Sequence, residues 1–206
     1  MARELDEQGQ ALLDAASHLL AAEGAGALTV RRIAGDAGCS TMGVYSRFGN
    51  KDGVVDQLFM EGFVRLIAAM DDVGVTDDPL DDMHRCGLAY RRNALENSTY
   101  YLVMFARAVP GFVPSDEAKI VSHSAFERLV DRVRRCQEAG QYIDGSPGEM
   151  AEVIWGAIHG HVMLELVGMS ATKTGDGPAE RYERMLDLIE RGFRTPGSER
   201  RSLSLG

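Results

Sequence analysis

The stretch that decides the fold is Leu28–Lys51, LTVRRIAGDAGCSTMGVYSRFGNK. It contains two short segments with the apolar spacing of helices, and each follows a good N-cap residue, Thr29 before the first and Ser40 before the second. Gly38 interrupts the helical pattern between them, and small residues at the crossing let two helices approach closely. The stretch therefore predicts a helix-turn-helix.

Such a unit places its second helix in the major groove of DNA, while its first helix spans the phosphate backbone. We expect Arg31 to reach a guanine edge and Met42 to meet a thymine methyl group. Cationic and hydroxyl groups on either side are expected to hold phosphates. The predicted DNA-binding residues are Thr29, Arg31, Arg32, Ser40, Thr41, Met42, Gly43, Tyr45, Arg47 and Lys51.

The overall charge does not itself favour nucleic acid. The chain has a formal net charge of −9 at pH 7, and residues 1–53 carry five cationic side chains against seven acidic ones. Local placement of positive groups, not their total, decides whether a surface binds DNA. We therefore expect weak non-specific affinity and a few well-placed cations.

The N-terminal segment resembles a known family. Leu28-Thr29, Ile33-Ala34, Ala37-Gly38, Ser40, Tyr45, Phe48 and Lys51 resemble the N-terminal domain of TetR-type (tetracycline-repressor-like) bacterial regulators, over residues 5 to about 65. The resemblance implies a homodimer on double-stranded operator DNA and a C-terminal domain that binds a small-molecule effector. It implies repression more often than activation. Two departures suggest modest phosphate affinity: the segment before the first helix lacks the usual basic residues, and Gly53 lies at the start of the helix that follows the helix-turn-helix.

Helical periodicity continues along the chain, and alternating strand patterns are absent, so the fold is expected to be all-α. After the helix-turn-helix, helices are predicted over about 51–70, 80–96, 100–107, 115–140, 147–167 and 178–191, with a flexible loop over 172–177. We expect a three-helix DNA-binding domain over 1–50, whose first helix carries the apolar residues from Leu5 to Leu20 and ends at Gly24. A larger helical effector-binding and dimerisation domain is expected over 51–194, and a disordered tail over 195–206. No apolar run approaches the roughly 20 residues that cross a bilayer, and no signal sequence is visible, so a cytoplasmic protein without a membrane partner is expected.

Two runs, Met104–Phe112 and Trp155–Gly160, resemble the C-terminal subtype named for its Trp, His and Gly. Glycines one turn apart on the helix near residue 156 would let another helix approach closely, which suits a two-fold four-helix interface. The candidate dimer-interface residues are Gly156, Gly160, Tyr182, Met185, Leu186 and Ile189.

The ten methionines and thirteen Phe or Tyr residues are many for a small core. Linings rich in aromatic side chains and Met suit pockets for varied apolar ligands, although packing of the core is the alternative for each residue. The candidate ligand-binding residues are Phe63, Tyr90, Tyr100, Met104, Phe105, Phe126, Trp155, His159 and Met163. A small, mostly apolar effector is expected.

The sequence offers little for metal or catalytic chemistry. His159 and His161 are two residues apart, so a helix points them about 200° apart, and His161 with Glu165 is one pair only. Phosphate-binding loops and hydrolase motifs are absent. The three cysteines are too scattered for a disulfide framework or a metal knuckle. We expect no cofactor, no metal and no enzymatic activity.

Together these features predict a ligand-responsive transcriptional regulator, in the first place a repressor released from its operator by the effector. The alternative is a helical small-molecule carrier or enzyme with a vestigial helix-turn-helix, which the acidic N-terminal segment favours.

Overall fold

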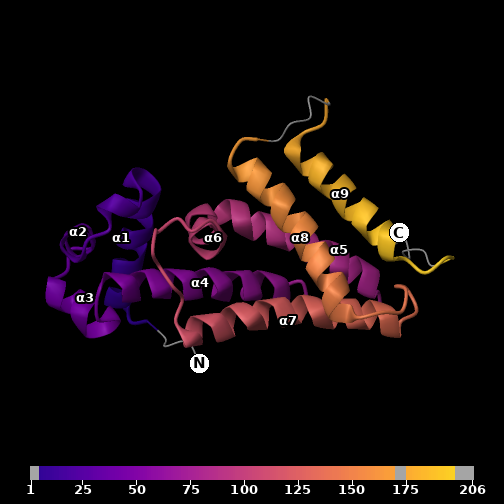
Figure 1. The fold of residues 1–206 in the computed structure, drawn as a ribbon, viewed down its shortest axis with the longest axis horizontal. Helices are drawn as coiled ribbons and strands as arrows, with labels where there is room; N and C mark the ends of the chain where they lie inside the picture. Colours follow the sequence, from indigo (N-terminus) through magenta and orange to yellow (C-terminus); the bar gives the residue numbers. More distant parts are fainter. Residues whose placement is uncertain (1–4, 170–174, 198–206) are drawn as a thin grey trace, which may run out of the picture. The chain divides into compact units, whose positions relative to one another are not determined.

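The computed structural model describes residues 5–169 and 175–197, and this part of the chain is helical, with one isolated β-bridge between Tyr142 and Arg194. The all-α prediction is confirmed. In chain order the elements in Figure 1 are α1 (Glu7–Glu23), the 3₁₀ turn η1 (Ala25–Ala27), α2 (Val30–Asp36), α3 (Thr41–Phe48), α4 (Lys51–Asp71), α5 (Pro79–Glu96), α6 (Ser98–Phe105), α7 (Asp116–Glu138), α8 (Pro147–Leu166) and α9 (Pro178–Phe193).

The helix ends follow local chemistry. Gly24, at φ 78°, ends α1, and its amide donates to the Leu20 carbonyl. Ser146 caps α8, and Pro147 occupies the first turn, where its missing amide hydrogen is no loss. Residues 172–174 of the predicted loop and 198–206 of the predicted tail lie outside the described residues. Within the described ranges, no helix is long and apolar enough to cross a membrane.

The first of two compact units comprises residues 1–65 and 97–124. In it α1 contacts α2, α3 and α6, and the indigo N-terminal helices of Figure 1 form one cluster. Its interior is made of fully buried aliphatic side chains from four helices: Leu12, Leu13, Ile33, Val44, Val54 and Leu58. These residues fix the orientation of the two short helices α2 and α3.

The second unit comprises residues 66–96 and 125–206. In it α5 contacts both α8 and α9, and α8 lies beside α9 (Figure 1). The Tyr182 hydroxyl donates to the Gly87 carbonyl at 2.8 Å. A Cβ atom at Gly87 would lie 2.7 Å from Leu186 Cδ2, so this glycine allows α9 to approach α5 closely.

Asp82 ties the connector before α5 to the helices of the second unit. Its fully buried carboxylate accepts hydrogen bonds from the amide and hydroxyl of Thr76, both at 2.8 Å, and from Arg135 at 2.9 Å. Burial would raise the pKa of Asp82, but the bonds from Arg135 and Thr76 outweigh it and keep the pKa below its ordinary value. The connector is therefore held by a charged group in the interior.

Candidate nucleic-acid interface and effector region

The turn between α2 and α3 forms as the sequence predicts. Thr29 Oγ1 accepts a hydrogen bond from the Arg32 amide at 3.3 Å, and Ser40 Oγ accepts one from the Gly43 amide at 3.2 Å. Gly38 adopts φ +64°, a left-handed conformation that glycine enters at little cost. The caps and this turn together set where α3 begins.

Helix α3 has two different sides. Gly43 and Val44 are buried, whereas Met42 and Tyr45 are 70% and 51% exposed. Thr41 and the capping Ser40 are exposed as well. We call Ser40, Thr41, Met42 and Tyr45 the exposed α3 face, because it offers two hydroxyls, a thioether and a phenol to a partner.

Arg47 lies at the end of α3 and is bound by a carboxylate. Its Nε and Nη2 atoms donate to the two carboxylate oxygens of Asp6 at 2.8 and 2.6 Å. Asp6 is also the N-cap of α1, where it accepts from the Gly9 amide at 2.7 Å. The hydrogen bond to Asp6 raises the pKa of Arg47. Any anion that binds this guanidinium would have to compete with Asp6.

Arg32 is held in the same way. Its guanidinium donates to both carboxylate oxygens of Glu23, at 2.7 and 2.6 Å, and this bond lowers the pKa of Glu23. Arg31 is exposed, and Lys51 is half-buried at the first residue of α4. The sequence did not predict a role for Asp6 or Glu23, since the Asp6–Arg47 pair spans 41 residues and no local pattern marks it.

The placement of Gly43 corrects one expectation. It is buried, because the side chains of Gln8 and Arg47 cover it, and a Cβ atom there would lie 3.8 Å from both. It therefore does not belong to the exposed part of α3.

Gly53 is explained by a close approach. A Cβ atom there would lie 1.9 Å from the Phe48 carbonyl oxygen, so α4 begins directly against the end of α3. The Gly53 amide donates to Asn50 Oδ1 at 2.9 Å. A better helix former at this position would collide with the backbone.

Four of the nine candidate ligand-binding residues gather in the first unit. The Phe63 and Phe105 rings lie 5.5 Å apart, and the Arg65 guanidinium stands 4.3 Å from the centre of the Tyr100 ring. Met104 packs its sulfur over Gly62, where a Cβ atom would be only 2.5 Å away. The sequence reasoning missed two neighbours, Phe59 and Tyr101, whose rings lie 5.0 and 4.9 Å from those of Phe63 and Phe105.

The other five candidates belong to the second unit. The Trp155 ring lies 6.2 Å from Phe126 and 5.7 Å from His159, and the Tyr90 hydroxyl lies 3.3 Å from His159 Nδ1. Burial lowers the pKa of His159. Tyr90 is buried, whereas Met163 and the three ring residues of α7 and α8 are half-buried. Four of the candidates thus belong to the first unit and five to the second.

The dimer candidates divide between surface and interior. Gly156 is exposed, Gly160 is half-buried, and no described atom lies within 4 Å of a Cβ atom built at either. Met185 and Ile189 are half-buried. Tyr182 and Leu186 correct the expectation, because they are buried in the interior of the single chain and have no free side to offer a second copy.

The exposed side of α8 carries more apolar residues than the sequence analysis identified. Val153, Leu164 and Val167 are all exposed. With the two glycines they recur at spacings of three and four residues, which places them on one side of the helix. We call Val153, Gly156, Gly160, Leu164 and Val167 the α8 stripe.

His161 and Glu165, the histidine–carboxylate pair considered from the sequence, have other partners. Glu165 accepts hydrogen bonds from Arg91 at 2.9 and 2.6 Å, and the His161 ring packs 5.4 Å from that of Tyr182. Among the described residues, His84, Asp187 and Glu190 form a group whose ligand atoms are close enough to hold a metal ion.

Two family models match the chain. Residues 12–58 match the model of bacterial regulatory proteins of the tetR family, and residues 83–189 match the model described as "Tetracyclin repressor-like, C-terminal domain". With the helix-turn-helix and its exposed α3 face, these matches define a DNA-binding transcriptional regulator. The chain belongs to the TetR family. The Trp-His-Gly subtype stays a prediction.

Solved structures share the fold over nearly the whole chain. A protein of unknown function from Rhodococcus sp. RHA1 is 23% identical, with TM-score 0.79, and covers 95% of this chain and 100% of its own. The TetR-family transcriptional regulator PfmR from Thermus thermophilus is 20% identical, with TM-score 0.68 and coverages of 89% and 99%. The fatty acid degradation regulator FadR from Bacillus halodurans is 15% identical, with TM-score 0.74 and coverages of 97% and 100%. A comparison with curated proteins finds no significant match.

Proposed function

We propose that this TetR-family chain is a homodimeric repressor that leaves its operator when a small, mostly apolar effector binds. The exposed α3 face carries the proposal. A short helix with Met42 and Tyr45 turned outward has no folding reason to expose them, whereas a groove-binding helix needs them there. Two such faces in a dimer would meet half-sites roughly 34–36 Å apart on a pseudo-palindromic operator.

The proposed contacts follow from the chemistry of each group. Ser40 and Thr41 would offer hydroxyls to base edges, and Met42 would pack on a thymine methyl group. Tyr45, Arg47 and Lys51 would hold phosphates, together with the Thr29 end of α2. Arg31, which is exposed, would reach a guanine.

The dimer is supported by the α8 stripe. Its aliphatic side chains are exposed in the single chain, and its two glycines leave room for a helix of a second copy. An isologous contact of this kind pairs the same surface of both copies about a two-fold axis.

Release by an effector requires differential binding. To shift a population from 1:99 to 99:1, an effector must favour one conformation by about 10⁴-fold. The aromatic and Met clusters offer mainly apolar contacts, with the Tyr90 hydroxyl and His159 as polar groups.

The first test is selection of bound duplexes from a random pool by the purified protein. The selected site should be a pseudo-palindrome, and the logarithm of its affinity should fall linearly with the logarithm of salt concentration. Arg47→Ala and Lys51→Ala should each reduce the slope by about one, whereas Arg92→Ala, at an exposed position of α5, should leave it unchanged. A folded dimer that binds no duplex at low ionic strength would exclude the proposal.

The second test is a thermal-shift screen of small metabolites. An effector at 100 times its dissociation constant adds about 2.7 kcal/mol to the free energy of unfolding. A true effector must also release the selected duplex. If only polar, zwitterionic compounds do so, the apolar effector is excluded.

A further inference from the structure

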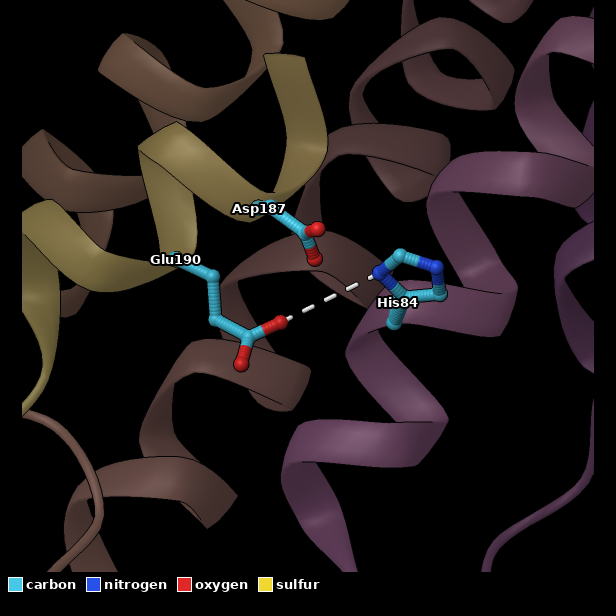
Figure 2. A group of neighbouring side chains, drawn as sticks. All are labelled: His84, Asp187 and Glu190. Atoms are coloured by element: carbon cyan, nitrogen blue, oxygen red, sulfur yellow. Dashed lines mark ion pairs between the residues drawn. The ribbon is translucent and has the colours of Figure 1, made fainter. Parts of the chain in front are cut away.

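Three potential metal ligands converge from α5 and α9 in the second unit. Figure 2 shows His84 on α5 pointing toward Asp187 and Glu190, which lie one helical turn apart on α9. The nearest ligand atoms of the three residues all lie within 4.8 Å of one another. His84 Nδ1 is 3.9 Å from Glu190 Oε2.

These side chains are withdrawn from solvent, unlike ordinary surface carboxylates. The His84 side chain is 15% exposed and that of Glu190 is 5% exposed. Removing a carboxylate from water is costly unless a cation or hydrogen-bond donors compensate it. Two carboxylates and a neutral imidazole form a donor set of formal charge −2. The Arg194 guanidinium, which pairs with Glu190, compensates one of these charges, and a divalent cation would compensate the other.

One oxygen of Glu190 is already committed. Arg194 Nη2 donates to Oε1, which leaves Oε2 on the side of His84 (Figure 2). Arg194 is itself fixed by its β-bridge to Tyr142, beside a bond from the Thr195 amide to the Gln141 carbonyl at 2.9 Å. A positioned partner of this kind orients a metal-binding carboxylate.

We propose that His84, Asp187 and Glu190 bind a divalent transition-metal ion. An imidazole nitrogen with two carboxylate oxygens suits Zn²⁺, Co²⁺, Mn²⁺ or Fe²⁺, whereas Mg²⁺ and Ca²⁺ prefer sites made of oxygen alone. Ligand atoms around a tetrahedral zinc ion are about 3.4 Å apart, from bonds of about 2.1 Å. The ligand atoms here lie within 4.8 Å of one another, and rotation of the side chains can bring them to the shorter separation that a bound ion requires.

A bound ion would join the start of α5 to the end of α9. Three protein ligands leave a coordination position for water or a small anion, as in zinc sites that are not closed. The inference does not depend on operator binding or on the effector, because it concerns residues of the second unit alone.

The test uses the full-length protein, stripped with a chelator and titrated with Co²⁺, and with Zn²⁺ in competition with a chromophoric chelator. One ion should bind per chain, with visible Co²⁺ bands and no thiolate charge-transfer band. That spectrum distinguishes this site from the cysteines of the chain. Mg²⁺ should not compete. Zn²⁺ should also raise the melting temperature.

The variants Asp187→Asn, Glu190→Gln and His84→Gln should each weaken Co²⁺ and Zn²⁺ binding by about tenfold or more. His123→Gln, at an exposed position of α7, is the matched control and should bind as the original chain does. Circular dichroism checks the fold. If the changes at His84 or Glu190 prevent folding, metal binding by the Asp187→Asn variant decides, because Asp187 is only half-buried.

Equal binding by Asp187→Asn and the original chain would overturn the proposal, as would a thiolate band or no saturable binding. His84 and the two carboxylates would then be an ion-pair network without a metal.

Discussion

Asp6 combines a structural role with an ion pair. It caps α1 through the Gly9 amide, and it binds Arg47, the cation expected to hold a phosphate. Asparagine is as good an N-cap as aspartate but carries no charge. The two roles can therefore be separated by one substitution.

We expect Asp6→Asn to raise operator affinity several-fold at low salt and to steepen its salt dependence, because Arg47 then meets phosphate without a competing carboxylate. Affinity measured at a series of salt concentrations checks this. Asp14→Asn is the matched control, since Asp14 is an exposed acidic residue of α1 that accepts a hydrogen bond from the Gln10 side chain. Equal gains from both variants would mean that only the total charge matters.

Burial of His159 makes stability depend on pH. The pKa of His159 is lowered in the folded chain, so the unfolded chain, with a His pKa of about 6.5, binds more protons just below that pH. The free energy of unfolding should therefore fall as pH drops below about 6.5, until the pH has passed the lower folded-state pKa.

We expect His159→Gln, which stays neutral, to lose less stability than the original chain between pH 7.5 and pH 5.5. Urea unfolding at both pH values measures the difference. His123→Gln, at an exposed position of α7, is the control for removal of a histidine as such. Identical losses for His159→Gln and the original chain would contradict the assignment.

At the scale of single elements, the joint between α3 and α4 depends on a glycine where helix propensity favours alanine. Gly53→Ala should lower the free energy of unfolding by about 1–3 kcal/mol, since the new methyl group overlaps the Phe48 carbonyl oxygen. Gly35→Ala, in α2 with no described atom within 4 Å of its Cβ position, should instead be neutral or stabilising by roughly 0.5–1 kcal/mol. Chemical denaturation of both variants gives the comparison, and a stable Gly53→Ala protein would show that the joint can relax.

The helices and their caps could be predicted because their causes are local. The side chains of Thr29 and Ser40 accept hydrogen bonds from amides three residues further along, and Gly38 marks the turn because it interrupts the helical pattern. The direction in which α3 turns Gly43 could not be predicted, because it depends on Gln8 of another helix.

Pairs that join distant parts of the sequence were also missed. Arg91 and Glu165 are 74 residues apart, and Arg47 and Asp6 are 41 apart. The His84 group was missed for the same reason, since its ligands come from α5 and α9. The candidate ligand-binding residues were chosen because Met and aromatic residues are abundant. Abundance does not show which of these side chains lie in the same unit.

At the scale of the whole molecule, the α8 stripe decides the oligomeric state that we propose. Gly156→Glu should leave the single chain folded, because the position is exposed, but it should weaken the dimer by at least about tenfold, since it places a charge in a helix contact. Sedimentation at a series of concentrations measures this. Gly35→Glu adds the same charge at another exposed helical glycine and should not affect dimerisation. A fully dimeric Gly156→Glu protein would place the interface elsewhere.

The contact between Gly53 and the Phe48 carbonyl has a mechanical consequence. There is no room for even a methyl group between the end of α3 and the first turn of α4, so the two helices are in direct backbone contact there. We expect a displacement of the first turn of α4 to move α3 as well, the helix that we propose to read the groove. Such a direct contact suits a regulator in which a small movement of α4 has to change the orientation of α3.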